Sequence, residues 1–140
     1  MAARMIIAAD TSVWIDYYRN PETKYARALN AAIESDRIRV PDVVLLELLR
    51  GIGSEVSARI VQEEFENYEV VHVGGRALAV AAARNFRLLR AKGITIRGSI
   101  DLMIGTWCII NNTPLLHNDR DFDMMEQHLG LERVSVESFQ

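Results

Sequence analysis

Short apolar runs alternate with longer amphipathic stretches along the whole chain. An unbroken apolar run of three to six residues is typical of a buried strand, whereas apolar residues spaced three and four apart indicate a helix. The runs predict strands over residues 5–9, 38–40, 68–73, 114–116 and 131–134. The amphipathic stretches predict helices over residues 12–19, 21–35, 41–50, 55–67, 76–91, 99–111 and 119–128. Strands that alternate with helices favour a parallel sheet covered by helices on both faces.

Proline, glycine and serine mark the ends of several predicted helices. Pro21 and Pro41 suit the first position of a helix, because proline lacks an N–H that would be unpaired there. Gly51 and Gly93 suit the positions after the last turn. Ser99 is a good N-cap for the helix over residues 99–111, because its hydroxyl can accept a hydrogen bond from a free backbone N–H.

Length and composition favour one compact domain over residues 1–140. Apolar residues make up 49% of the chain, which is enough for a sizeable core. We find no run of roughly 20 apolar residues, so we expect no membrane contact. Asp10 interrupts the first apolar run before it could serve as a signal peptide, and we therefore expect a cytoplasmic protein. Cys108 is the only cysteine, which excludes an intrachain disulfide and a cysteine-rich zinc site.

Charge is unevenly distributed. The net charge is −3, which does not by itself indicate a nucleic-acid-binding protein. Residues 76–100 nevertheless carry six basic side chains and no acid. On the helix predicted there, Arg84, Arg87 and Arg90 lie opposite the apolar stripe. They are candidates for phosphate contacts with RNA, and an ordinary solvated helix face is the alternative.

Acidic residues follow two of the predicted strands. Asp10 comes directly after the first strand, and Asp119 and Asp121 come after the strand over residues 114–116. Ligands of parallel sheets gather beyond the carboxyl ends of the strands, so these acids should meet at one edge. Asp101 lies in the first turn of its helix. Each acid also has a structural explanation, because Asp is a good N-cap and is favourable near a helix N-terminus.

Glu47 is harder to explain structurally, because it stands in the apolar helix "PDVVLLELLRG". An ionised, unpaired carboxylate buried on such a helix would cost several kcal/mol. Arg50 could pair with it. The alternative is that Glu47 converges with Asp10, Asp101 and Asp119 around a cation. With oxygen ligands alone, that cation should be Mg²⁺ or Mn²⁺.

Three segments resemble those of a known family. The stretches "DTSVWIDYYR", "VPDVVLLELLRG" and "SIDLMIGTWCIINNTPLLHNDRDF" are similar in order and spacing to PIN-domain ribonucleases, and in particular to the VapC toxins of bacterial toxin–antitoxin pairs. The resemblance implies an α/β fold, a PIN-like three-layer α/β/α sandwich around a parallel sheet of four to five strands. It also implies a Mg²⁺- or Mn²⁺-dependent endoribonuclease, a hydrolase in which metal-activated water cleaves RNA phosphodiesters.

The resemblance also assigns residues and partners. Asp10, Glu47, Asp101 and Asp119 match the family's four acids, which makes them the expected catalytic residues and metal ligands. Asp121 matches an acid that often accompanies the fourth, and the spacing does not decide which of the two approaches the metal. The hydroxyl that supports the first acid matches Thr11 or Ser12. The implied partners are an RNA substrate, a cognate VapB-like antitoxin and a second copy of the chain in a homodimer.

Two other functions compete with the nuclease. A Mg²⁺-dependent phosphatase or phosphotransfer domain also uses an Asp after its first strand, but Ser12 stands where one such phosphatase class has a second Asp. A catalytically silent PIN-like binding module would be favoured by the loss of an acid, and all four are present. His117 stands at a predicted strand end, where we expect it to pack rather than to act as a base.

Overall fold

The central element of the computed structural model, which describes residues 5–139, is a four-stranded parallel sheet with the order β3-β2-β1-β4. Its strands are β1 (Ile7–Ala9), β2 (Ile38–Pro41), β3 (Glu69–Val71) and β4 (Leu115–Leu116). The α-helices within the described residues are α1 (Thr11–Arg19), α2 (Lys24–Glu34), α3 (Asp42–Arg50), α4 (Glu55–Glu64), α5 (Gly75–Ala91), α6 (Ser99–Ile110) and α7 (Arg120–Leu129). Two 3₁₀ turns, η1 (Phe65–Asn67) and η2 (Val136–Phe139), complete the described chain.

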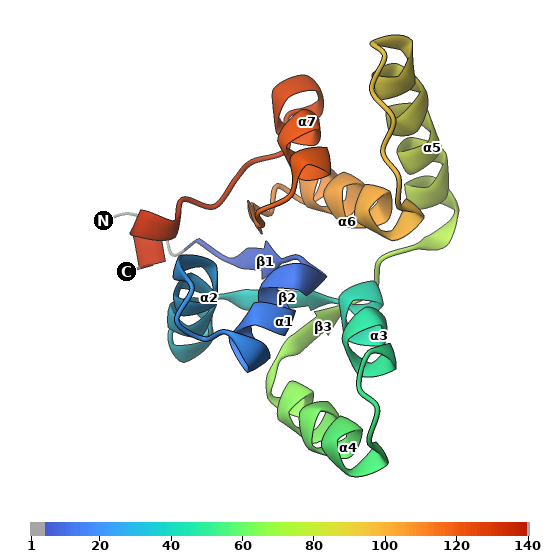
Figure 1. Ribbon diagram of the computed structural model, residues 1–140. Helices are drawn as coiled ribbons and strands as arrows, with labels where there is room; N and C mark the ends of the chain where they lie inside the picture. The colour runs from blue at the N-terminus through green and yellow to red at the C-terminus, as the bar shows by residue number, and fades with distance from the viewer. Residues whose placement is uncertain (1–4, 140) are drawn as a thin grey trace.

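Helices cover both faces of the sheet, so the α/β architecture predicted from the alternating pattern is confirmed. In Figure 1, α5, α6 and α7 lie on one side of the sheet, and α1 and α2 lie on the other. The residues of β1 and β4 are fully buried, as expected for strands covered on both faces. Helix α4 projects away from the sheet below α3.

The register of the strands places the ends of β1 and β4 side by side. Ala9 pairs with Leu116, and the N–H of Asp10 donates to the carbonyl of Leu116 at 3.1 Å. Because the strands are parallel, the chain leaves both of them at the same edge of the sheet. The residues after β1 and those after β4 therefore start from neighbouring points, as expected for the predicted site.

The predicted strand over residues 131–134 is wrong. In the described chain this segment forms one isolated bridge, between Leu115 and Arg133, and no strand. The N–H of Val134 donates to Leu115 and the N–H of Leu115 donates to Glu132, so the segment runs beside β4 for a single bridge. A run of apolar residues shows that a segment is buried, but it does not fix how many backbone hydrogen bonds the segment can form.

Helix starts also differ from those predicted. Pro21 lies in a turn, and Thr23 caps α2 by accepting a hydrogen bond from the N–H of Ala26 at 3.2 Å. Pro41 is the last residue of β2, just before α3. Ser99 begins α6 but does not cap it, because Gly98 occupies the cap position without a side-chain hydrogen bond. Proline and serine indicate a helix start, but they do not fix the position within one turn.

Close packing of α6 on α7 brings two acidic segments together. Gly105 of α6 lies so near Met125 of α7 that a Cβ there would overlap the Met125 Sδ and Cε atoms. This contact holds the N-terminal turn of α6, which carries Asp101, close to the start of α7. Within residues 5–139, no helix is both long enough and apolar enough to cross a bilayer.

Candidate active site

Asp10 is a buried N-cap at the end of β1. Its carboxylate accepts hydrogen bonds from the backbone N–H of Ser12 at 2.5 Å and from the Ser12 hydroxyl at 3.0 Å. Burial raises the pKa of Asp10, and the two Ser12 hydrogen bonds partly offset that rise. The capping explanation is therefore correct, and the hydroxyl that supports the first acid belongs to Ser12 rather than to Thr11.

Thr11 instead supports Glu47. The Thr11 hydroxyl donates to Oε1 of Glu47 at 2.6 Å, and this bond links the start of α1 to the middle of α3. Arg50 is exposed and, among the described residues, forms no ion pair with Glu47. The pairing that would have explained Glu47 structurally is therefore wrong, and its carboxylate is held beside the first acid instead.

Asp119 is the N-cap of α7. Its Oδ1 accepts from the backbone N–H of Asp121 at 2.7 Å. The carboxylate of Asp121 accepts at 3.4 Å from the backbone N–H of Arg97, in the loop before α6. Both acids thus start the same helix, and Asp121 is additionally tied to the neighbouring loop.

Asp101 is influenced by all four of the other acids. Burial raises the pKa of Asp101 to about 7, and the charges of Asp10, Asp119, Glu47 and Asp121 contribute to that rise in decreasing order. Asp119 also raises the pKa of Asp10. Asp119 and Asp121 both stand at the start of α7. Asp119 raises the pKa of both Asp10 and Asp101, and it raises the pKa of Asp101 more than Asp121 does.

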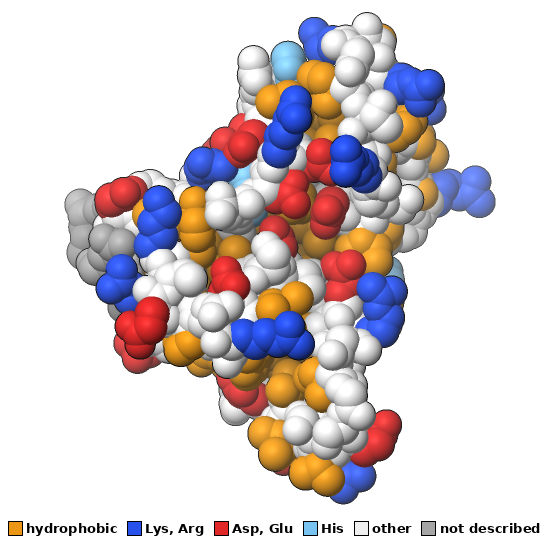
Figure 2. Space-filling model, viewed as in Figure 1, with side chains coloured by type: hydrophobic (Ala, Val, Ile, Leu, Met, Phe, Trp, Pro, Cys, Tyr) orange, Lys and Arg blue, Asp and Glu red, His pale blue; other side chains and the backbone are white. Residues whose placement is uncertain are grey.

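These five acids have no basic partner among the residues that the structure describes. Across residues 5–139, none of them forms an ion pair with a Lys, Arg or His side chain. Figure 2 shows acidic side chains gathered in the middle of the face between α7 and α1, with basic side chains around them. Buried carboxylates without a counter-charge are costly, and a donor set made only of oxygens suits a hard divalent cation. The residues present therefore fit Mg²⁺ or Mn²⁺.

Among the described residues, no three of these acids have ligand atoms that all lie within 4.8 Å of one another. Among the described residues, the three-residue group whose ligand atoms all lie within 4.8 Å of one another is His117, Asp123 and Glu126. Asp10, Glu47 and Asp119 are each held by hydrogen bonds from nearby residues of the fold. Their assignment as metal ligands stays a prediction.

A polar hollow opens beside the acids, and we call it the acid hollow. It has a volume of about 440 Å³ and lies between the loop before α6 and the start of α7. Its lining residues are Gly93, Ile94, Thr95, Arg97, Asp119, Arg120, Asp121 and Met124. Neither Arg97 nor Arg120 was predicted as a site residue. Their positions in the sequence could have indicated them, because Arg97 lies four residues before Asp101 and Arg120 directly follows Asp119.

A second hollow, which we call the apolar groove, lies between α1, α3 and α4. It has a volume of about 200 Å³ and is lined by Ile15, Tyr18, Arg19, Glu47, Leu48, Gly51, Ile52, Ser57 and Val61. Tyr18 is partly exposed there, and its hydroxyl donates to Glu64 at 2.9 Å. Trp14 is fully buried and packs on Phe65, so it belongs to the core. Glu47 is the one residue of the acid set that lines this groove.

The remaining predicted residues lie outside both hollows. Arg84, Arg87 and Arg90 are exposed on α5 and form no ion pair with a described residue. Cys108 is buried, which raises the pKa of its thiol to about 12 and confirms it as a small apolar core residue. His117 is also buried, as predicted, and both of its ring nitrogens are hydrogen-bonded.

Known proteins of similar sequence are ribonucleases. The chain is 25% identical over 132 residues to VapC ribonuclease Mb1587 of Mycobacterium bovis, covering 93% of this chain and 98% of that protein. Ribonuclease VapC11 of Mycobacterium tuberculosis matches with the same identity and coverage.

Solved structures of similar fold come from toxin–antitoxin complexes. VapBC2 of Rickettsia felis, bound to a DNA fragment from its promoter, matches with a TM-score of 0.74 and 19% identity over 93% of this chain and 98% of the other. DNA-bound VapBC of Salmonella typhimurium matches with a TM-score of 0.72 and 21% identity over 94% and 98%. The PIN domain family matches residues 7–127. The resemblance seen in the sequence is therefore confirmed, and the chain belongs to the PIN domain family.

Proposed function

We propose that the protein is a Mg²⁺- or Mn²⁺-dependent endoribonuclease and the toxin of a toxin–antitoxin pair. One observation carries the proposal: at the carboxyl edge of a parallel sheet, four acids that form no ion pair with a described residue raise the pKa of Asp101. Its relatives among the mycobacterial VapC ribonucleases match along nearly their whole length, which supports the same activity here. We expect it to act in the cytoplasm, on RNA.

In this proposal Asp10 and Asp101 would be the main ligands of the metal ion, and Glu47 and Asp119 would complete the site. Asp119 rather than Asp121 is the proposed ligand, because its charge raises the pKa of both Asp10 and Asp101. A bound Mg²⁺ or Mn²⁺ would activate water for attack on phosphorus and neutralise the charge that develops on the phosphoryl oxygens.

The rest of the site keeps these carboxylates in place. Ser12 donates two hydrogen bonds to Asp10, and Thr11 donates one to Glu47. The Ser12 bonds favour the ionised form of Asp10. All three bonds limit rotation of the carboxylates, so the acids need little reorganisation when a cation and a phosphate enter. No protein nucleophile is required, and none of the five acids has to form a covalent bond with the substrate.

The acid hollow is the proposed entry for RNA. Arg97 and Arg120 are exposed at its rim and form no ion pair with a described residue, so both are available for phosphates. Phosphate contacts dominate nucleic-acid affinity, and a rim of positive charge offsets the repulsion between the acids and the RNA backbone. Arg84, Arg87 and Arg90 on α5 are the proposed outer contacts.

The apolar groove is the proposed site for a VapB-like antitoxin. An amphipathic helix binds in a groove of this kind by burying its apolar face. The solved relatives are VapBC complexes, which supports a partner of this type. Glu47 lines the groove and also belongs to the acid set. A bound segment would therefore end next to the metal ligands.

We also propose a homodimer. An apolar hollow of about 260 Å³ lies between α5 and α6, lined mainly by small and apolar residues such as Leu78, Ala82 and Met103. A second copy that packs its own α5 and α6 against this surface would bury it. Sedimentation of the purified chain as a monomer at micromolar concentration would contradict this part of the proposal.

Incubation of the purified, antitoxin-free chain with structured RNAs tests the function. We expect cleavage in Mg²⁺ or Mn²⁺, with 5′-phosphate and 3′-hydroxyl ends, and none in EDTA. Asp10→Asn and Asp101→Asn should each abolish cleavage, because the amide removes a negative charge without changing the shape of the side chain. Glu55→Gln, an exposed acid of α4, is the matched control and should cleave normally.

Two outcomes would contradict the proposal. Cleavage that persists in both Asp variants would show that a contaminant is responsible. Hydrolysis of a phosphomonoester without RNA cleavage would favour the phosphatase, and RNA binding without cleavage would favour a silent binding module.

A further inference from the structure

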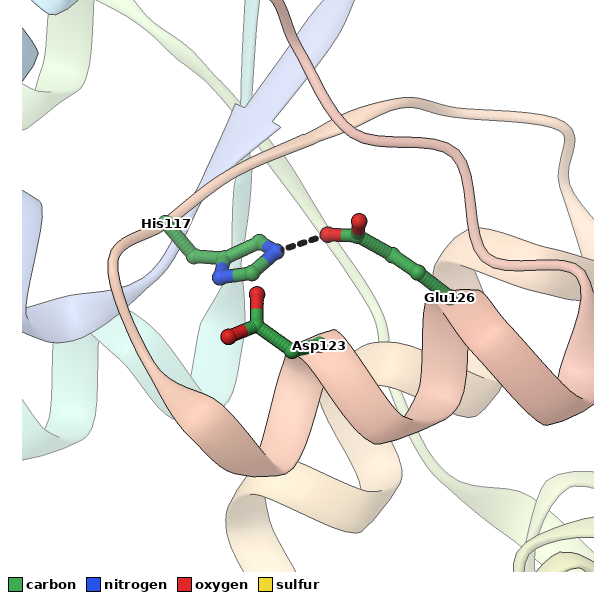
Figure 3. A group of neighbouring side chains, drawn as sticks. All are labelled: His117, Asp123 and Glu126. Carbon is green, nitrogen blue, oxygen red and sulfur yellow. Dashed lines mark hydrogen bonds and ion pairs between the residues drawn. The ribbon is translucent and has the colours of Figure 1, made fainter.

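His117 is fully buried, and both of its ring nitrogens are in use. It follows β4 directly and precedes Asp119 by two residues. Its Nδ1 accepts a hydrogen bond from the backbone N–H of Asp119 at 3.2 Å. Its Nε2 is hydrogen-bonded to Oε2 of Glu126 on α7, as Figure 3 shows. The imidazole therefore connects the backbone of one proposed metal ligand to a carboxylate further along α7.

These partners fix the tautomer of the ring. An N–H donor requires an unprotonated acceptor, so Nδ1 of His117 carries no proton. The proton then lies on Nε2, which donates to the Glu126 carboxylate. The phenyl ring of Phe122 lies 5.1 Å from the imidazole, centroid to centroid, and encloses it further. A ring held by two hydrogen bonds and by packing cannot turn without breaking both bonds.

Arg133 holds the far end of this chain of hydrogen bonds. Its Nε donates to Oε2 of Glu126 at 3.1 Å, and its Nη2 pairs with Asp123. The backbone on either side of Arg133 is fixed to β4, through the hydrogen bonds that join Leu115 to Glu132 and Val134. The segment after α7 thus anchors α7 and, through His117, the loop that carries Asp119.

The same group resembles a metal site by proximity but does not suit one. His117, Asp123 and Glu126 have ligand atoms within 4.8 Å of one another. The guanidinium of Arg133 already pairs with both carboxylates and offsets half of their negative charge. A divalent cation would have to displace this guanidinium and share Nε2 with a proton. The geometry favours a structural support for the acids over a second metal centre.

We propose that His117, held by Glu126 and Arg133, is a positioning residue for Asp119, and this inference rests on the proposed function. By accepting the Asp119 N–H, the ring fixes the backbone from which the Asp119 carboxylate projects. One carboxylate oxygen of Asp119 is already used for the N–H of Asp121. The charge of Asp119 raises the pKa of both Asp10 and Asp101, so the carboxylate that this backbone carries belongs to the same group of acids.

Mn²⁺ binding to the full-length chain, measured by calorimetry or electron paramagnetic resonance, tests the proposal without relying on cleavage. His117→Leu removes the acceptor and should weaken Mn²⁺ binding about 10- to 100-fold, the usual cost of losing a group that orients a metal ligand. His117→Asn places an amide oxygen near the position of Nδ1 and should restore most of the affinity. His128→Leu, on α7 but outside the group, is the matched control and should bind like the wild type.

A purely structural role would lower the melting temperature without changing the affinity of the folded protein. His117→Leu that is folded and binds Mn²⁺ within about twofold of the wild type would therefore overturn the proposal. Glu126→Ala tests the same connection at a partly exposed position if His117→Leu fails to fold. We expect a loss of about three- to tenfold for this variant, and an unchanged affinity would again overturn the proposal.

The same measurements distinguish a failure of this inference from a failure of the proposed function. If the proposed function fails, the wild-type chain would bind no Mn²⁺, and Asp10→Asn would make no difference to it. Failure of the inference alone would leave wild-type binding intact and sensitive to Asp10→Asn, but insensitive to His117→Leu. A ¹⁵N spectrum of the imidazole provides an independent check, since it should show the tautomer protonated on Nε2.

Discussion

The apolar groove and the acid hollow are each lined by different members of the acid set and have opposite character. Glu47 lines the groove, which otherwise consists largely of apolar side chains from α1, α3 and α4. Asp119 and Asp121 line the hollow, together with Arg97 and Arg120. The groove offers apolar area to a folded partner, and the hollow offers charge to a phosphate chain. The difference suggests that a partner and a substrate approach the acids from separate directions.

Substitution of the acids between the two surfaces should have the largest effect. Asp101→Asn should lower RNA cleavage at least about 100-fold, since even changes to groups that only support metal ligands cost about 10- to 100-fold. Binding of the antitoxin and of RNA should persist, because neither surface is altered. Gel-based cleavage and calorimetry on one preparation measure both. A variant that loses partner binding as well would show that the surfaces are not independent.

A charge in the apolar groove should separate it from the hollow. Ile52→Glu should weaken antitoxin binding about 10- to 100-fold, because it places a carboxylate in the apolar contact area. RNA cleavage should stay within about twofold of the wild type. Val56→Glu, on the exposed face of α4, is the control, since Val56 is 70% exposed and does not line the groove. Equal effects of the two variants would place the antitoxin elsewhere.

Removal of positive charge from the hollow should give the reverse result. The double variant Arg97→Ala with Arg120→Ala should weaken RNA binding about fivefold. It should also flatten the dependence of log K on log salt by about 0.7 for each phosphate of single-stranded RNA that the variant no longer neutralises. Antitoxin binding should not change.

The triple variant Arg84→Ala, Arg87→Ala and Arg90→Ala tests the outer track on α5. We expect a smaller loss of RNA affinity than for the pair at the hollow, since these side chains do not line it. Filter binding at several salt concentrations measures both variants. A larger loss for the triple variant would make α5, rather than the rim of the hollow, the main RNA-binding surface.

The smallest expected effect is on stability and its dependence on pH. The pKa of Asp101 is about 7 in the folded chain, against an ordinary value of 3.8. The folded state therefore holds this proton more tightly, and the free energy of unfolding should fall as the pH rises from about 4 to 7 when no metal is added. A divalent cation favours the ionised carboxylates, so its stabilising effect should grow over the same range.

Melting curves at pH 5 and pH 8, with and without Mg²⁺, measure this effect. We expect Mg²⁺ to raise the melting temperature more at pH 8 than at pH 5, by about 3 °C, or roughly 1 kcal/mol for a chain of this size. Asp101→Asn should remove most of the difference. An equal gain at both pH values would argue against a cation at these acids.

Local signals predicted much of the fold and where the acids stand relative to its strands and helices. The apolar runs located β1, β2, β3 and β4, although the strands are mostly shorter than predicted. The capping explanation was correct for Asp10 and Asp119, because a cap involves only residues two or three apart. Local sequence patterns failed for residues 131–134. Their apolar side chains are buried, but the segment does not form a strand.

The sequence by itself determined which acids follow which elements, because strand, cap and helix patterns depend on neighbours within about one turn. The tertiary structure alone decided how the acids are held. The Thr11–Glu47 bond joins residues 36 positions apart, and the contact between Arg97 and Asp121 spans 24. The support of His117 by Glu126 and Arg133 likewise depends on where the segment after α7 packs. Such contacts form only when elements far apart in the sequence pack against each other, and a local sequence pattern cannot predict how those elements pack.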